Sequence, residues 1–292
     1  MATAMGKATA DITTIDAARR LRDGIGGHAM KTEWTGAAKL AALGGALMLA
    51  IAAAPGANSF LDAGYLNLID VVPPAPIPQE ARGVADRDVF KLTRSLKGTP
   101  RWDMAVADLS GDPAAMLRGF ACATRVAMTP TNAPKTVALL EKASRDTLRE
   151  TDELKSFYKK KRPFLIDSGE ICEPQTDALA TSYDYPSGSA TKGWTWGLIL
   201  AEILDDRAAP ILSRARAYGE SRVVCGAHSM SAVEAGRMVA SSTMAVVRTE
   251  PDYADGVVAA RAELAALRRA GGGPSAQSCS AEEALVTQPI FR

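Results

Sequence analysis

Apolar residues recur at intervals of three and four along most of the chain after residue 80, which is the spacing of one face of an α-helix. The segments with this spacing are 86–96, 100–109, 113–128, 136–158, 193–204, 208–221, 228–248 and 253–270. No strand-like alternation competes with the helical spacing, and no internal repeat or linker interrupts it. The pattern therefore predicts an all-α protein with a single compact helical domain.

Residues 40–54, LAALGGALMLAIAAA, form the one long apolar run, which is shorter than the about 20 residues of a membrane helix. A weakly positive stretch from Met30 precedes the run, and small residues that suit cleavage follow it. We interpret the run as the core of a signal peptide, with translation starting at Met30. An uncleaved membrane anchor is the alternative.

Glycines and a proline at 271–274 are expected to end the last helix. The predicted organisation is an upstream extension and signal peptide at 1–57, the helical domain at 58–270 and a C-terminal tail at 271–292.

The charge is balanced, with 34 Lys and Arg against 33 Asp and Glu, and 47% of the residues are hydrophobic. This composition excludes a disordered protein and offers no general electrostatic attraction to nucleic acid. The only histidines are His28 and His228, so a histidine-rich metal site is excluded. The four cysteines lack CxxC spacing, and in an exported protein an even number favours disulfides.

Three segments carry candidate chemistry, and each also has an ordinary structural explanation. Lys155 and Arg162 are seven residues apart, so they project from one side of a helix if the helix continues that far; a solvated basic face is the alternative. The turn Pro186-Ser187-Gly188-Ser189 precedes a helical run, and its amides suit an anion or a simple N-cap. Arg222 precedes His228 by six residues, and a lone histidine is more often structural.

Together these segments resemble the signature K-x6-R-P, P-S-G-H and S-R-x5-H-x3-D of the phosphatidic acid phosphatase type 2 superfamily. The stretches GESRVVCG at 219–226 and AEIL at 201–204 are similar to the class A bacterial non-specific acid phosphatases. The resemblance runs from about residue 60 to residue 269 and implies the helical fold shared with vanadium haloperoxidases. It also implies a periplasmic or secreted homo-oligomer that acts on small phosphomonoesters, or binds inorganic phosphate, without a metal or cofactor.

The resemblance also assigns roles. It implies that His228 attacks phosphorus to give a phosphohistidine. The residues that it places around the phosphate are Lys155, Arg162, Ser187, Gly188 and Arg222. The resembling phosphatases carry cysteines at the positions of Cys172 and Cys225, which implies a disulfide between these two, and elimination leaves Cys122 for Cys279.

Two positions depart from the signature. Ser189 stands where the family has the histidine that protonates the leaving alcohol, and a serine hydroxyl is too weak an acid for that role. Ala232 stands where an aspartate orients the nucleophile. Glu234 and Asp184 are carboxylates that the fold can place near the site.

We therefore expect an attenuated phosphomonoesterase. The alternatives are a phosphate-binding pseudoenzyme, a haloperoxidase-like activity and a pocket that has been adapted to non-phosphoryl chemistry.

Overall fold

The computed structural model describes residues 58–288 and 290. All regular secondary structure in these residues is helical, which confirms the all-α prediction. The expected signal peptide, the start at Met30 and the alternative membrane anchor lie outside the described residues, as does His28. Within 58–288, no helix has both the length and the apolar character that crossing a bilayer requires.

The helices differ widely in length, from five residues to 25. In chain order they are α1 (Ala81–Thr93), α2 (Pro100–Ala107), α3 (Pro113–Thr124), α4 (Pro134–Tyr158), α5 (Asp177–Thr181), α6 (Gly188–Ile203), α7 (Ala208–Val224), α8 (Met230–Val247), α9 (Pro251–Ala270) and α10 (Ala276–Thr287).

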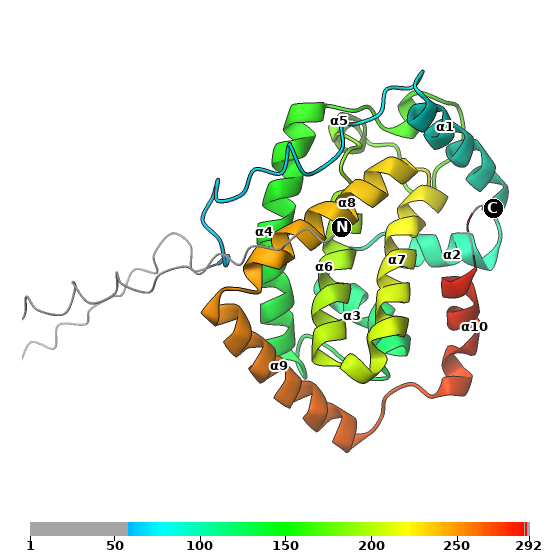
Figure 1. Cartoon of the computed structure of the whole chain (residues 1–292). Coiled ribbons are helices and arrows are strands. Elements are labelled where there is room, and N and C mark those ends of the chain that lie inside the picture. The colour runs from blue at the N-terminus through cyan, green and yellow to red at the C-terminus, as the bar shows by residue number, and fades with distance from the viewer. Residues whose placement is uncertain (1–57, 289, 291–292) are drawn as a thin grey trace, which may run out of the picture. The chain divides into compact units, whose positions relative to one another are not determined.

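Helix α6 lies at the centre of the described helices, packed against α4, α7 and α8 (Figure 1). It buries side chains on nearly every side, which is why its sequence lacks a clear polar face. A Cβ atom at Gly193 would lie 2.4 Å from the Tyr218 ring, and one at Gly197 would lie 2.3 Å from the Ala215 Cβ. These two glycines therefore allow the backbones of α6 and α7 to approach closely.

Several helix starts follow from local sequence. Proline occupies the first position of α2, α3, α4 and α9, where a missing amide hydrogen costs nothing. Ser187 caps α6, since its hydroxyl accepts a hydrogen bond from the Ala190 amide. Helix α6 consequently begins five residues before the predicted position 193. Helix α8 begins at Met230 and leaves His228 in the preceding loop, whereas the spacing predicts a helix from 228.

The segment after α9 differs from the prediction. The glycine run does end α9 at Ala270, but α10 follows, so the expectation that α9 is the last helix is wrong. Helix α10 packs on α3 and α7 and is joined to α3 by a disulfide between Cys122 and Cys279. A second disulfide joins Cys172 to Cys225. These are the two pairings that we expect from the sequence.

Candidate active site

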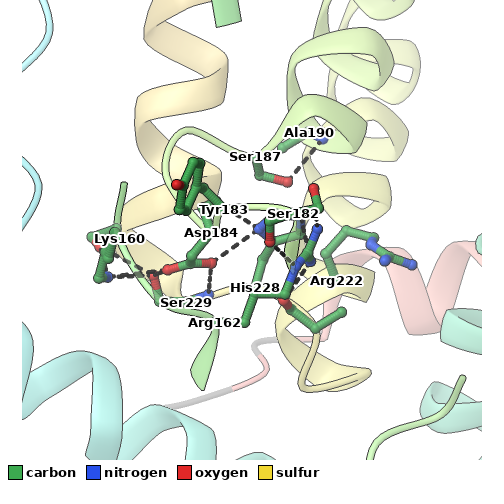
Figure 2. Close-up of polar contacts among 12 residues, drawn as sticks. Lys160, Arg162, Ser182, Tyr183, Asp184, Ser187, Ala190, Arg222, His228 and Ser229 are labelled. Carbon is green, nitrogen blue, oxygen red and sulfur yellow. Dashed lines mark hydrogen bonds and ion pairs between the residues drawn. The ribbon is translucent and has the colours of Figure 1, made fainter. Parts of the chain in front are cut away.

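The three candidate segments meet where α4 and α7 end and where α6 and α8 begin (Figure 2). Helix α4 ends at Tyr158, and Lys159 has a left-handed backbone with φ of 49°. Arg162 therefore lies beyond the helix that carries Lys155. The helix does not continue far enough for both cations to project from one of its faces. A turn of the chain, rather than helical spacing, directs Arg162 toward His228.

His228 lies in the short loop between α7 and α8 and is only 4% exposed. Its amide donates a hydrogen bond to the Arg222 carbonyl at 3.2 Å, which holds the loop against the end of α7. The ring contacts different kinds of group on its two sides. Nε2 lies 3.1 Å from Nη1 of Arg162, while Nδ1 lies 2.8 Å from the Asp184 carbonyl oxygen and 3.0 Å from Asp184 Oδ1.

These contacts indicate which ring nitrogen of His228 carries the proton. Arginine only donates hydrogen bonds, whereas the Asp184 carbonyl and an ionised carboxylate only accept them. The matching tautomer carries its proton on Nδ1 and leaves a lone pair on Nε2. Burial, followed by the positive charge of Arg162, lowers the pKa of His228 to about 3, so the ring is neutral near neutral pH.

The three predicted phosphate-binding cations lie around this ring with internal partners. Nη1 of Arg162 donates to the Ala227 carbonyl at 2.8 Å, and its Nε donates to the Ser182 carbonyl at 2.7 Å. The Lys155 ammonium donates to the Tyr183 carbonyl, and burial, followed by the charge of Arg162, lowers its pKa to about 8. Arg162 and Lys155 are therefore held in place by carbonyl groups, and a bound anion would compete with these groups for the two cations.

Arg222 forms an ion pair with Glu173, with 2.5 Å between its Nη2 and Glu173 Oε1. Glu173 follows Cys172, whose disulfide to Cys225 fastens this loop next to the end of α7. The Nε atom of Arg222 is buried and has no hydrogen-bond partner among residues 58–288 and 290. Arg222 thus retains a buried donor that Glu173 does not use.

The turn before α6 connects two of the motifs. The Ser187 amide donates a hydrogen bond to the Ala232 carbonyl at 2.9 Å, which joins the turn to the first turn of α8. Gly236, one turn further along α8, lies so close that a Cβ atom there would be 2.6 Å from the Ser187 carbonyl oxygen. Gly188 and Ser189 are the first residues of α6, and amides at a helix start lack intrahelical partners. This end of α6 suits an anion.

The two departures from the signature lie in different surroundings. Ser189 is half-buried in the first turn of α6. Ala232 is completely buried, and its methyl group packs in an apolar cluster that includes Leu154, Tyr185 and Val239. Position 232 is therefore part of the packing behind the site.

Sequence reasoning does not single out Lys160, the middle residue of three consecutive lysines between Lys155 and Arg162. The Lys160 ammonium lies 2.8 Å from Asp86 Oδ2 and 3.2 Å from Asp184 Oδ2, with its side chain only 9% exposed. It also donates to the hydroxyls of Ser229 and Ser231 at 2.7 and 3.1 Å. Nothing in a run of three lysines distinguishes the middle one, because the turn after Tyr158 determines which side chain points inward.

No group of three or more acidic, cysteine or histidine side chains within residues 58–288 and 290 has the arrangement of a metal site. Arg162 and Lys155 bring positive charge close to His228.

Comparison with known proteins agrees with this geometry. The model of the PAP2 superfamily matches residues 137–253. An acid phosphatase of Zymomonas mobilis is 35% identical over 211 residues, which cover 72% of this chain and 80% of that protein. Non-specific acid phosphatases of Salmonella typhimurium and Providencia stuartii are each 29% identical, over 66% and 70% of this chain and 78% and 83% of their own lengths. The chain belongs to the PAP2 superfamily, and within it to the bacterial acid phosphatases.

Proposed function

We propose that this protein is an exported acid phosphatase that hydrolyses small phosphomonoesters through a phosphohistidine on His228. The observation that carries the proposal is the buried, neutral imidazole whose Nε2 lone pair faces Arg162, with Lys155 and Arg222 nearby. The acid phosphatases to which the chain is similar support the same activity. The two disulfides suit an oxidising compartment such as the periplasm or the extracellular space.

The reaction proceeds in two displacements. Nε2 of His228 forms a bond to phosphorus as the bond to the leaving oxygen breaks, and the departing alkoxide takes a proton from water. A water molecule then attacks phosphorus, the N–P bond breaks and phosphate leaves after the water has lost a proton. Arg162, Lys155 and Arg222, together with the Ser187–Gly188 turn, stabilise the charge on the phosphoryl oxygens.

Turnover is attenuated, and it depends on the leaving group. General acid catalysis contributes about 10²–10⁴-fold, and Ser189 does not supply it. Nitrophenolate leaves without a proton, whereas an alkoxide needs one. The protein therefore favours aryl phosphates and anhydrides over alkyl phosphates.

The experiment is an assay of p-nitrophenyl phosphate hydrolysis beside phosphate-binding calorimetry on the same preparation, with His228→Asn as the control variant. Turnover in the parent and its loss in His228→Asn, with phosphate binding retained, is the expected result. A burst of nitrophenolate that is stoichiometric with protein would identify the covalent intermediate. Turnover that survives in His228→Asn would refute the nucleophile.

A phosphate-binding pseudoenzyme is the second candidate. The missing general acid favours it, because Ser189 stands where the family signature has the histidine that protonates the leaving group. Phosphate binding without turnover in the same experiment would support this candidate. Haloperoxidase-like and non-phosphoryl chemistry have no comparable observation in their favour.

A further inference from the structure

Asp184 is a completely buried carboxylate in the loop between α5 and α6, and it lies beside His228 (Figure 2). Oδ1 lies 3.0 Å from His228 Nδ1 and accepts a hydrogen bond from the Ser229 amide at 3.0 Å. Oδ2 accepts from the Ser229 hydroxyl at 2.6 Å and lies 3.2 Å from the Lys160 ammonium. The carboxylate is therefore held from two sides while it contacts the ring.

We propose that Asp184 is the positioning residue for His228, in the role for which the family signature uses an aspartate at position 232. The proposal rests on the proposed function, since it assigns a role in the same reaction. Ala232 leaves position 232 without a carboxylate, and Asp184 reaches Nδ1 from a different element of the fold. The chain has thus lost the family's orienting residue while retaining an orienting carboxylate.

The proposed phosphoryl transfer needs a negative charge beside Nδ1 of His228. When Nε2 bonds to phosphorus, the imidazole becomes cationic, and a carboxylate at Nδ1 stabilises that cation as well as the starting tautomer. The Asp184 backbone carbonyl also accepts from Nδ1, but it brings no charge. Burial alone would raise the pKa of Asp184, but the Lys160 ammonium and the hydrogen bonds from His228 and Ser229 hold that pKa well below its ordinary value. The carboxylate is therefore charged throughout the range in which phosphatases act.

A second buried carboxylate supports the first without touching the histidine. Asp86 Oδ2 lies 2.8 Å from the Lys160 ammonium, and Asp86 Oδ1 accepts from the Ser231 amide at 2.8 Å. Lys160 therefore bridges Asp86 and Asp184. Since both carboxylates are buried and share one lysine, Asp86→Asn disturbs the same network as Asp184→Asn but leaves the contact with Nδ1 in place. It is a matched control.

The first test compares kcat, KM and the unfolding temperature of the parent, Asp184→Asn and Asp86→Asn, with p-nitrophenyl phosphate as substrate. We expect Asp184→Asn to lose about 10²–10⁴-fold in kcat, by analogy with an amide in place of the orienting carboxylate, with KM within threefold of the parent. Asp86→Asn should keep a kcat at least tenfold above that of Asp184→Asn. A margin below tenfold between the two variants would overturn the proposal, because it would mean that Asp184 acts through the fold alone.

The second test does not depend on turnover. In ¹⁵N-histidine-labelled full chain, with the His28→Gln variant used for assignment, His228 should show a protonated Nδ1 and an unprotonated Nε2. A protonated Nε2 at neutral pH would overturn the positioning role even in an active enzyme. Conversely, an inactive parent with a protonated Nδ1 would remove the proposed function, and the assigned geometry of Asp184 and His228 would stand.

Discussion

Positions 189 and 232 both lack the side chain that the phosphatase signature specifies, but the molecule surrounds them differently. Position 232 is buried in an apolar cluster, and Asp184 contacts Nδ1 of His228 from a different segment. Position 189 is half-buried in the first turn of α6, and the side chain there is a serine hydroxyl. A lost orienting group is replaceable from another segment, because orientation needs only a fixed charge at one atom.

A lost general acid is harder to replace. It must have a suitable pKa and must also reach the leaving oxygen on the side of phosphorus away from the nucleophile. In the proposed mechanism, the difference between the two positions therefore separates the groups that bind and orient, which are Asp184, His228 and the three cations, from the proton donor, which Ser189 does not supply.

Restoring the acid should have the largest effect. Ser189→His is expected to raise kcat/KM for a simple alkyl phosphate about 10²-fold, because the alkoxide then leaves with a proton. The same variant should change p-nitrophenyl phosphate turnover less than tenfold. Parallel steady-state assays measure both, and equal gains for the two substrates would mean that position 189 does not face the leaving group.

In that variant, the new imidazole at position 189 and His228 should titrate differently. The half-exposed ring at position 189 is expected to titrate near the ordinary value of about 6.5, whereas His228, whose pKa is about 3, should be about nine-tenths neutral at pH 4. An NMR titration of ¹⁵N-labelled protein from pH 8 to pH 4 follows both. A His228 signal that titrates above pH 5 would contradict this low pKa.

The same low pKa also affects stability. Because the pKa of His228 is lower in the folded than in the unfolded chain, acid destabilises the fold as the pH falls from about 6.5 toward about 3.

Substitutions at the predicted phosphate-binding cations should have a smaller effect, which is on anion affinity. Arg222→Ala should weaken phosphate or vanadate binding at least about tenfold, because a charge-assisted hydrogen bond contributes roughly 1.5–3 kcal/mol. Glu173→Gln should tighten binding by up to about fivefold, because it removes the charge that competes with the anion for Arg222. Calorimetry measures both changes. Unchanged affinity in Arg222→Ala would show that this cation lies outside the anion site.

Ala232→Asp should have the smallest effect on catalysis. On the sequence alone, Ala232→Asp restores the aspartate of the family signature and is expected to raise the turnover of all substrates. Since Asp184 already contacts Nδ1, we now expect a change in kcat of less than threefold. A carboxylate added to the apolar cluster should instead cost about 2 kcal/mol or more, which lowers the unfolding temperature by roughly 4 °C or more. A large rise in kcat would show that Asp184 orients the ring poorly.

The sequence predicts the helical class and most helix positions because their apolar spacing is regular. It misplaces the start of α6, since the Ser187 cap starts the helix where apolar periodicity is absent. It misses α10, which buries few side chains and so carries a weak pattern. For the site, ordered motifs single out Arg162 and His228, which the structure brings into contact. The roles of Lys160 and Asp184 depend on a turn and on contacts between distant segments, which no local pattern contains.

The pairing of the cysteines has a consequence for how the chain acquires its covalent structure. The two bonds are nested: Cys172–Cys225 lies inside the interval closed by Cys122–Cys279. Cysteines that paired in their order of appearance during synthesis would join Cys122 to Cys172 and Cys225 to Cys279, which is one of the two incorrect connectivities open to four cysteines. Correct oxidation therefore requires either that α3 finds α10 before its thiol reacts or that a thiol–disulfide isomerase reshuffles the first bond.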